Sequence, residues 1–443
     1  MKTLDKIPTG KLKRSGKLLK TGMKVGGNYI KYYGDKLWSD NPQAKAKLDQ
    51  KNASDIYNRL QELKGPVLKV AQMLSMEKNI MPKAFTDQFA LSQFSVPPLS
   101  YALVRKTFRK SLGKNPEDIF DAFSNNAIHA ASIGQVHKAQ LKDKAFAVKV
   151  QYPGVKDSIS NDLRMVKPIA HRMFNIQKEG AKQYFAEVEQ KLIEETDYIF
   201  ELKQSQEFVK DCAPLSFIRF PQYYPQFSGD KIITMDWMEG VHFSEFIAQN
   251  PSQKVRNQLG QDLWDFYMYQ LHVLQKLHAD PHPGNFLISN DHQLMVIDFG
   301  CVKTIPNSFY RPYLEITRQD TLNNSEKLEK RLEELEFLNA QDTKTERQFF
   351  IELLTEILAL LTRPLRSITF DFTDEQYFQE IANLGQRYTK LSRLKNLRIN
   401  RGSKHFIYVN RSLFGLYNMM NALGAKGVSI NRYKTLGIQE EGY

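Results

Sequence analysis

Three polar residues in the middle of the chain are of the types that handle a phosphate group and its metal ion. Asp280 and Asn285 lie in the segment HADPHPGN, and Asp298 opens an Asp-Phe-Gly triplet directly after the apolar run MVI. Phosphoryl transfer needs a carboxylate near the acceptor hydroxyl, and it needs amide and carboxylate oxygens that hold Mg²⁺ against the nucleotide phosphates. We therefore expect Asp280 to be catalytic, and Asn285 and Asp298 to be metal ligands.

The Asp-Phe-Gly triplet alone is a weak signal, because an Asp at a turn after a strand is more often structural. The Asp and Asn that precede it, at the spacing of one loop, favour the chemical interpretation. His278 and His282 are also four residues apart, a spacing that can place two metal ligands on one face of a helix. Pro281 and Pro283 argue against a helix there, so we expect structural roles for both histidines.

A lysine on an alternating strand could bind the α- and β-phosphates of the nucleotide. In the segment FAVKVQ, Lys149 points to the opposite face from Phe146, Val148 and Val150. A lone lysine on a strand is usually just solvated. Here a tight loop precedes the lysine and an acid-bearing helix follows it, as a nucleotide site would require, so Lys149 joins the expected catalytic set.

The acidic segment EETDYIFE lies inside a helix predicted over roughly Gln183–Lys210. Asp197 and Glu201 are four residues apart and share a face of that helix, and Glu201 is the expected salt-bridge partner of Lys149. Glu195 would lie nearly opposite Asp197, so the two could serve one site only if the helix bends or two surfaces meet there. A solvated acidic face is the alternative for Glu195 and the glutamate before it.

The segment HAASIG, residues 129–134, lies where a phosphate-covering loop is expected, although a glycine-rich GxGxxG pattern is absent. The small residues Ala130, Ala131 and Ser132 would still let backbone N–H groups approach the phosphates. Because alanine allows fewer backbone conformations than glycine, we expect a stiffer loop. Taken alone, the stretch would also suit an ordinary strand start.

The remaining patterns predict helices first, then a β-rich lobe, then a helical lobe, which is an α+β chain. The predicted organisation is a basic tail over residues 1–40, a helical extension over 41–100, a β-rich lobe over 101–239 and a helical lobe over 240–443. Within it we expect a hairpin with arms Ala127–Leu141 and Lys144–Tyr152, a strand over Lys231–Met238, and mainly helices from Ser252 onward.

The chain has 443 residues, a net charge of +13 and two cysteines. The charge favours anionic partners, and so few cysteines argue against a disulfide framework. Basic residues interleave with apolar ones over the first 25 residues, which suits either a solvated tail or a segment lying on an anionic membrane. Signal-peptide and membrane-spanning patterns are absent, so we expect a cytoplasmic protein, soluble or peripheral at the membrane.

Several motifs, in order, resemble the ABC1/UbiB/AarF family of atypical protein-kinase-like proteins. They are LKVAQMLS, AASIGQVH, AVKVQYPGV, EETDYIFE, HADPHPGN and IDFG, and the similarity runs from about residue 50 to about residue 425. The resemblance implies a protein-kinase-like fold with two lobes and an N-terminal helical extension packed over the active site. It also implies that ATP or ADP binds with Mg²⁺.

The resemblance assigns further roles residue by residue. The family's Lys-x-Gly-Gln signature falls on Lys69 and Gln72, with Ala71 in place of its glycine, and His129 replaces the first alanine of the family's Ala-rich loop. The expected gating residues are Lys69, Gln72, Glu195 and Asp197. The expected nucleotide contacts are Ala130, Ala131, Ser132, Lys149, Met238 and Glu239.

As function, the resemblance implies an atypical kinase or ATPase that supports isoprenoid quinone biosynthesis or lipid homeostasis. A conventional Ser/Thr protein kinase and a non-catalytic nucleotide-sensing scaffold are the alternatives. The expected partners are a nucleotide, anionic membrane lipids, isoprenoid quinone precursors and quinone-biosynthesis proteins. A nucleic-acid partner is not expected, because the basic excess is strongest in the tail and no nucleic-acid motif accompanies it.

Overall fold

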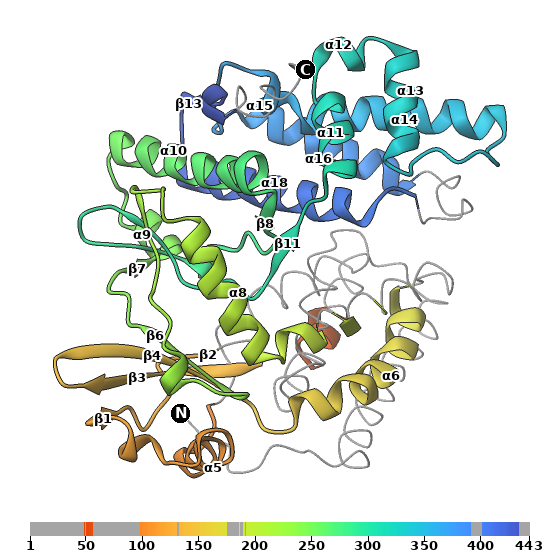
Figure 1. Cartoon of the computed structure of the whole chain (residues 1–443). Helices are drawn as coiled ribbons and strands as arrows, with labels where there is room; N and C mark the ends of the chain where they lie inside the picture. The colour runs from red at the N-terminus through yellow and green to blue at the C-terminus, as the bar shows by residue number, and fades with distance from the viewer. Residues whose placement is uncertain are drawn as a thin grey trace. The chain divides into compact units, whose positions relative to one another are not determined.

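The computed structural model describes residues 98–130, 133–174, 192–390 and 401–433, together with residues 48, 50–55, 186, 189 and 190 (Figure 1). The chain divides into two compact units. Unit 1 comprises Met1–Lys203 and Gln222–Trp237, and unit 2 comprises Gln204–Pro221 and Met238–Tyr443. The predicted tail and most of the predicted helical extension, including Lys69 and Gln72, lie outside the described residues.

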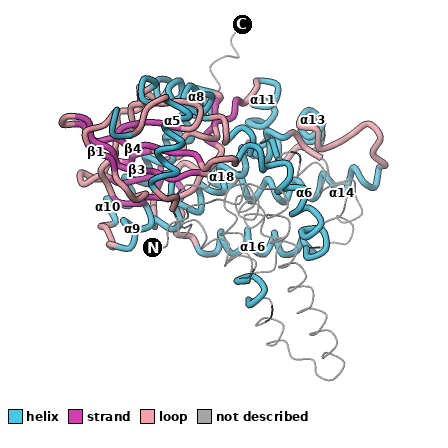
Figure 2. Tube along the Cα trace, turned by 90° about the horizontal axis from the view of Figure 1, so that it is seen from below, coloured by secondary structure: helices cyan, strands magenta, loops and turns pink. Residues whose placement is uncertain are grey.

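Unit 1 is built on a five-stranded antiparallel sheet in which β1, β3 and β4 lie side by side (Figure 2). The strand order is β1-β3-β4-β6, and β2 pairs with the same edge of β3 as β1. The strands are β1 (Ala122–Phe123), β2 (His129–Ala130), β3 (Gly134–Leu141), β4 (Lys144–Gln151) and β6 (Ile232–Asp236).

The predicted hairpin is present as β3 and β4, joined at Lys142, whose φ is 53°. Its first arm was predicted too long: residues 127–141 form two strands, β2 and β3, which pair antiparallel with each other. The break therefore falls inside the segment HAASIG, between Ala130 and Gly134. Ala131 and Ser132 lie outside the described residues.

One face of this sheet is closed by a buried polar chain that begins at Leu99. The backbone N–H of Leu99 donates to Gln135 Oε1 at 2.7 Å, and Gln135 Nε2 donates to His137 Nε2 at 2.8 Å. His137 Nδ1 then donates to the carbonyl of Ser124 at 2.7 Å. Burial lowers the pKa of His137 to about 4, so the ring stays neutral and the chain of bonds stays intact. The polar residues of the GQVH motif thus fix the segment at Leu99 to the sheet.

Unit 1 also contains helices α5 (Tyr101–Leu112) and α6 (Val155–Phe174) and the first residues of α8 (Tyr198–Asp211). The predicted helix over Gln183–Lys210 is broken at Asp197, which is not helical. Its carboxylate instead accepts the backbone N–H of Phe200 at 3.0 Å, as an N-cap residue does. The prediction of one continuous helix over this range was therefore wrong: Asp197 caps α8, and Glu201 lies in the first turn of that helix.

Unit 2 is mainly helical, and α10 and α18 lie side by side in its core (Figure 1). Its larger helices are α10 (Gln253–Tyr269), α11 (Asn307–Ile316), α13 (Ser325–Glu334), α14 (Lys344–Leu361), α16 (Glu375–Lys390) and α18 (Lys404–Leu423). The shorter ones are α9 (Phe243–Ala248), α12 (Gln319–Leu322) and α15 (Arg363–Arg366). Its strands are β5 (Ile218–Arg219), β7 (Val241–His242), β8 (Lys276–His278), β9 (Phe286–Ile288), β10 (Leu294–Val296), β11 (Val302–Thr304), β12 (Thr369–Phe370) and β13 (Val428–Ser429).

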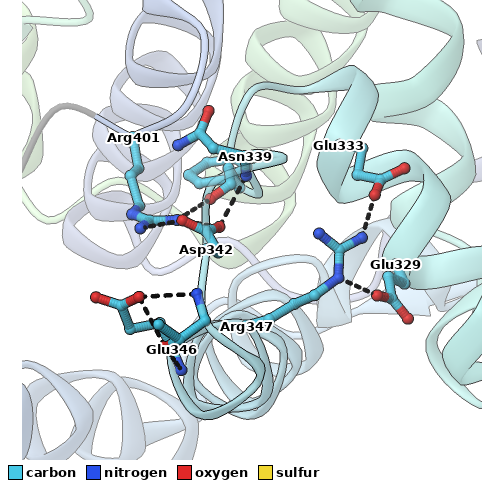
Figure 3. A network of polar contacts seen from close by, with 9 residues as sticks. Glu329, Glu333, Asn339, Asp342, Glu346, Arg347 and Arg401 are labelled. Carbon is cyan, nitrogen blue, oxygen red and sulfur yellow. Dashed lines mark hydrogen bonds and ion pairs between the residues drawn. The ribbon is translucent and has the colours of Figure 1, made fainter.

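Ion pairs fix the start of α18 to the connection between α13 and α14 (Figure 3). Arg401 donates to both carboxylate oxygens of Asp342 at 2.6 Å, and Asp342 also accepts the backbone N–H of Asn339. Arg347, in the first turn of α14, forms ion pairs with Glu329 and Glu333 on α13 and so joins these two helices. Such paired, multiply bonded charges order the segments that carry them, although each exposed pair adds little stability.

Neither cysteine forms a disulfide, and both are buried. Burial raises the pKa of Cys212, at the end of α8, to about 12. Cys301 directly follows the Asp-Phe-Gly triplet. Within the described residues, no helix is both long enough and apolar enough to cross a membrane.

Candidate active site

Two β pairings in unit 2 bring Asp280, Asn285 and Asp298 to one place. Strands β9 and β10 pair with Phe286 opposite Val296, and the backbone N–H of Ile297 donates to the carbonyl of Asn285 at 3.0 Å. Asn285 just before β9 and Asp298 just after β10 are therefore neighbours at one end of this hairpin.

The second pairing adds the catalytic candidate. Strands β8 and β11 pair with His278 opposite Val302, and the backbone N–H of Ala279 donates to the carbonyl of Cys301 at 2.8 Å. Asp280 follows at once, so it lies beside the segment that begins with Asp298. Short antiparallel pairings thus assemble residues that are up to 18 positions apart in the sequence.

Hydrogen bonds orient these polar side chains. Asn285 Nδ2 donates to the carbonyl of Asp280 at 3.0 Å and lies 3.5 Å from its Oδ2. This directs the amide nitrogen towards Asp280, so Oδ1 is the atom of Asn285 that would face a metal ion. Asp298 Oδ1 accepts the backbone N–H of Gly300 at 2.8 Å, which fixes the carboxylate plane.

The donor set fits Mg²⁺ bound together with phosphates. Magnesium prefers oxygen ligands and is usually held by one or two carboxylates plus substrate phosphates rather than by an all-protein cage. Asn285 and Asp298 supply an amide oxygen and a carboxylate. In the described part of the chain, no group of three or more His, Cys, Asp or Glu side chains could hold a metal by itself.

Phe299, between Asp298 and Gly300, anchors the Asp-Phe-Gly segment in the core of unit 2. Its ring is fully buried and contacts the rings of Phe208 at 5.2 Å, Phe220 at 5.8 Å and His278 at 5.9 Å. His278 is itself buried and belongs to this aromatic cluster, in agreement with the structural role expected for it. His282 Nδ1 accepts the backbone N–H of Gly284 at 3.0 Å and so shapes the turn before Asn285.

Two supports of the loop that carries Asp280 escaped the sequence reasoning, and the first is Gln270. This fully buried residue opens a π-helical turn, Gln270–Leu274, at the end of α10. Its Oε1 accepts the backbone N–H of His278 at 2.7 Å, and its Nε2 donates to the carbonyl of Phe266 at 3.1 Å. A π turn inside a helix often marks a functional site, but a single sequence does not reveal it.

The second support is the close approach of α18 to the loop. A Cβ atom on Gly415 would lie 2.7 Å from Pro281 Cβ and closer still to Pro281 Cγ. Three residues earlier on the same helix, Ser412 Oγ lies 3.4 Å from the carbonyl of His278. A glycine within an apolar helical pattern was the available signal, because such a residue usually has a packing reason.

Unit 1 holds the expected ion pair between Lys149 and Glu201. Lys149 Nζ lies 2.6 Å from Glu201 Oε1, and the two side chains are 12% and 9% exposed. The ammonium group also lies 5.3 Å from the centre of the Tyr198 ring. A charged pair this buried is costly to break by removing one partner, so each residue holds the other in place.

The other predicted nucleotide and gating residues are placed as follows. Ala130 lies in β2, whereas Met238 and Glu239 lie in the extended segment that follows β6. Glu195 ends a short helical segment, and Asp197 caps α8. Lys69, Gln72, Ala131 and Ser132 lie outside the described residues, so their roles stay predictions.

The fold is of the α+β class and is protein-kinase-like. A solved structure of Rv3197 with erythromycin, from Mycobacterium tuberculosis, superposes on the chain with a TM-score of 0.59 at 24% identity. The superposition covers 90% of this chain and 97% of that one. At this identity the likeness speaks for the fold alone.

The chain belongs to the ABC1 atypical kinase-like family, whose domain matches residues 92–332. It is 32% identical over 260 residues to Activity of BC1 complex kinase 8, chloroplastic, of Arabidopsis thaliana, covering 57% of this chain and 34% of that protein. It is 28% identical over 331 residues to atypical kinase COQ8B, mitochondrial, of Rattus norvegicus, and the match covers 73% of this chain and 61% of that protein. The chain thus spans about a third to three fifths of the length of these relatives.

Proposed function

We propose that this chain binds ATP with Mg²⁺ and acts as an atypical kinase or ATPase. The observation that carries the proposal is the convergence of Asp280, Asn285 and Asp298 at the ends of two β pairings. The buried pair of Lys149 and Glu201 supports it, because a phosphate-binding lysine needs an acidic partner to fix it.

Each residue has one task in the proposed reaction. Lys149 binds the α- and β-phosphates, and Glu201 holds the lysine in position. Asp280 orients the acceptor hydroxyl or water and accepts its proton. Asn285 and Asp298 would hold Mg²⁺, which when bound neutralises the charge of the phosphates.

We further propose that the activity serves isoprenoid quinone or lipid metabolism. The names of the relatives refer to the BC1 complex and to COQ8B, and this chain carries a net charge of +13 that suits an anionic membrane surface. Isoprenoid quinone precursors and quinone-biosynthesis proteins are the proposed partners.

Replacing Asp298 tests the metal assignment. Asp298→Asn keeps the shape of the side chain but removes the charge that faces the metal. We expect Mg²⁺-dependent ATP affinity to fall on the order of tenfold or more, which is at least about 1.4 kcal/mol. Calorimetric titration of ATP in Mg²⁺ measures this, with circular dichroism to verify the fold.

Asp291→Asn is the matched control. Asp291 lies in the turn between β9 and β10, at the opposite end of that hairpin from Asp298. Its carboxylate pairs with Arg219 at 2.6 Å. This variant should bind ATP as the unmodified chain does. Equal affinities of the Asp298→Asn and unmodified proteins in Mg²⁺ would show that Asp298 is not a metal ligand.

A further inference from the structure

One face of the unit 1 sheet gathers the polar groups suited to a nucleotide. The register places His129 opposite Val136, and Val136 opposite Lys149. The next row places Lys138 opposite Ala147, which in turn faces Met235 on β6. Residues directly opposite in a ladder share a face, so His129 and Lys138 lie on the face that carries Lys149.

This face is also the more open side of β3. Gln135, His137 and Ala139, which point to the other face, are buried in the polar chain and the aromatic core. Val136 and Lys138, which alternate with them, stay half-buried. The face of β3 that is shared with Lys149 is therefore the more exposed of its two faces.

Two aromatic rings meet over this open face. The His129 ring stacks on the Trp237 ring, with centroids 6.2 Å apart and planes 21° apart. Trp237 continues the pairing of β6, because its backbone N–H donates to the carbonyl of Ala145 on β4 at 3.1 Å. Strands β3 and β4 separate β2 from β6 in the sheet, so the two rings make contact across the face rather than along an edge.

Lys138 identifies the side on which the rings meet. Its ammonium group lies 4.8 Å from the centre of the Trp237 ring, and Lys138 belongs to the same face as Lys149. A cation over an indole face is an attractive contact that holds the ring in place. Trp237 is also directly followed by Met238 and Glu239, which are expected to contact the nucleotide.

We propose that His129 and Trp237 form an aromatic clasp over the nucleotide face, which must open for a purine nucleotide to bind and to leave. The clasp rests on the proposed nucleotide site, and it assigns a purpose to His129, where a small residue would suffice for a phosphate-covering loop. Because both association and release require the rings to separate, removing the clasp accelerates both steps and changes the equilibrium affinity less.

The test measures the exchange of a fluorescent ATP analogue by stopped-flow, with Mg²⁺ present, on the full chain. His129→Ala should raise the release rate about two- to tenfold, which is the factor that one aromatic pair contributes. His129→Phe restores a ring and should restore slow exchange. Trp237→Leu should match His129→Ala, and the double variant should add little beyond either one.

A second readout does not need the nucleotide. The chain has three tryptophans, Trp38, Trp237 and Trp264, and Trp264 is fully buried in unit 2. Loss of the stacked imidazole in His129→Ala should change the emission of the nucleotide-free protein, and the same change should be absent when Trp237 is already replaced by leucine.

The outcomes separate the two proposals. If the unmodified protein binds the analogue and His129→Ala exchanges it at an unchanged rate, the clasp is wrong and the nucleotide site stands. If the unmodified protein binds no analogue, the proposed function fails and the clasp fails with it. Faster exchange in His129→Ala without rescue by His129→Phe also overturns the clasp, because the ring would then be irrelevant.

Discussion

Asp262, on α10, is a carboxyl group that the fold holds in an unfavourable place. It is 6% exposed, and its Oδ1 accepts the side-chain amide of Gln258 at 2.9 Å. Burial is the largest cause that raises its pKa to about 6, the nearby Asp265 adds to the rise, and the guanidinium of Arg432 opposes it. At neutral pH the buried carboxylate therefore costs stability.

Asp262→Asn should stabilise the protein in a pH-dependent way. The pKa is higher in the folded state than in the unfolded chain, where it is about 3.9. The contribution of protonated Asp262 to the free energy of unfolding is therefore complete below about pH 4, and it is lost as the pH rises through 6. The asparagine side chain does not titrate, so the gain in free energy of unfolding should be near zero at about pH 4 and about 1–3 kcal/mol at about pH 8.

Denaturant unfolding at several pH values measures this gain. The asparagine can keep the bond from Gln258, because its Oδ1 still accepts. A gain that is equal at acidic and alkaline pH would contradict the assignment, since a packing effect does not depend on the titration of a carboxyl group.

The residues that sequence analysis anticipated are those whose roles follow from their own chemistry. Lys149 and Glu201 form the expected pair, and Asp280 and Asp298 come together as the order of their motifs suggested. Asp197 was misplaced, since an acidic residue in a helical pattern looks the same whether it caps a helix or lies inside it. Only the backbone distinguishes the two.

Among elements, α18 packs directly against the loop that carries Asp280. Gly415→Ala should push the helix and Pro281 apart, because the added methyl would overlap that ring. We expect a loss of about 1–3 kcal/mol in stability, together with reduced turnover, as Asp280 follows Pro281 out of position. Thermal unfolding and ATP hydrolysis measure the two effects.

Gly385→Ala is the matched control for this change. Gly385 lies inside α16, and a Cβ atom there would meet nothing within 4 Å. The same substitution should raise helix stability by about 0.5–1 kcal/mol and leave hydrolysis unchanged. If both variants behave alike, the contact with Pro281 is not what the loop requires.

This support was beyond sequence reasoning for a physical reason. Gly415 lies more than 130 positions from Pro281, and no local pattern tells which distant element a small residue faces. Gln270 was missed for the same reason, because its amide bonds the backbone of His278 only after α10 ends in a π turn. Helices and the hairpin follow from local periodicity, whereas these contacts follow from tertiary packing.

The charge of the whole molecule suggests how it meets a membrane. With a net charge of +13 and a basic, partly apolar N-terminal segment, the chain should bind anionic vesicles, and its ATP hydrolysis should rise in their presence. Each basic residue near the surface contributes on the order of 1 kcal/mol, screened within about 10 Å at 0.1 M salt. Salt should therefore release most of the bound protein.

Sedimentation with cardiolipin-containing vesicles measures the binding, and deletion of residues 1–24 identifies the segment responsible. The truncated chain should lose the vesicle stimulation and keep basal hydrolysis, because every proposed active-site residue lies far downstream. Equal sedimentation of the two proteins would exclude the segment as the membrane anchor.

The two buried thiols make the opening of unit 2 measurable in time. Burial raises the pKa of Cys212 to about 12, so the thiol stays protonated at pH 8, and the folded protein shields it from reagents. The alkylation rate of Cys212 therefore measures how often the end of α8 unfolds locally. Cys301, directly after the Asp-Phe-Gly triplet, reports local opening of that triplet instead. Comparing the two labelling rates with and without ATP would reveal how strongly ligand binding slows the opening of each region.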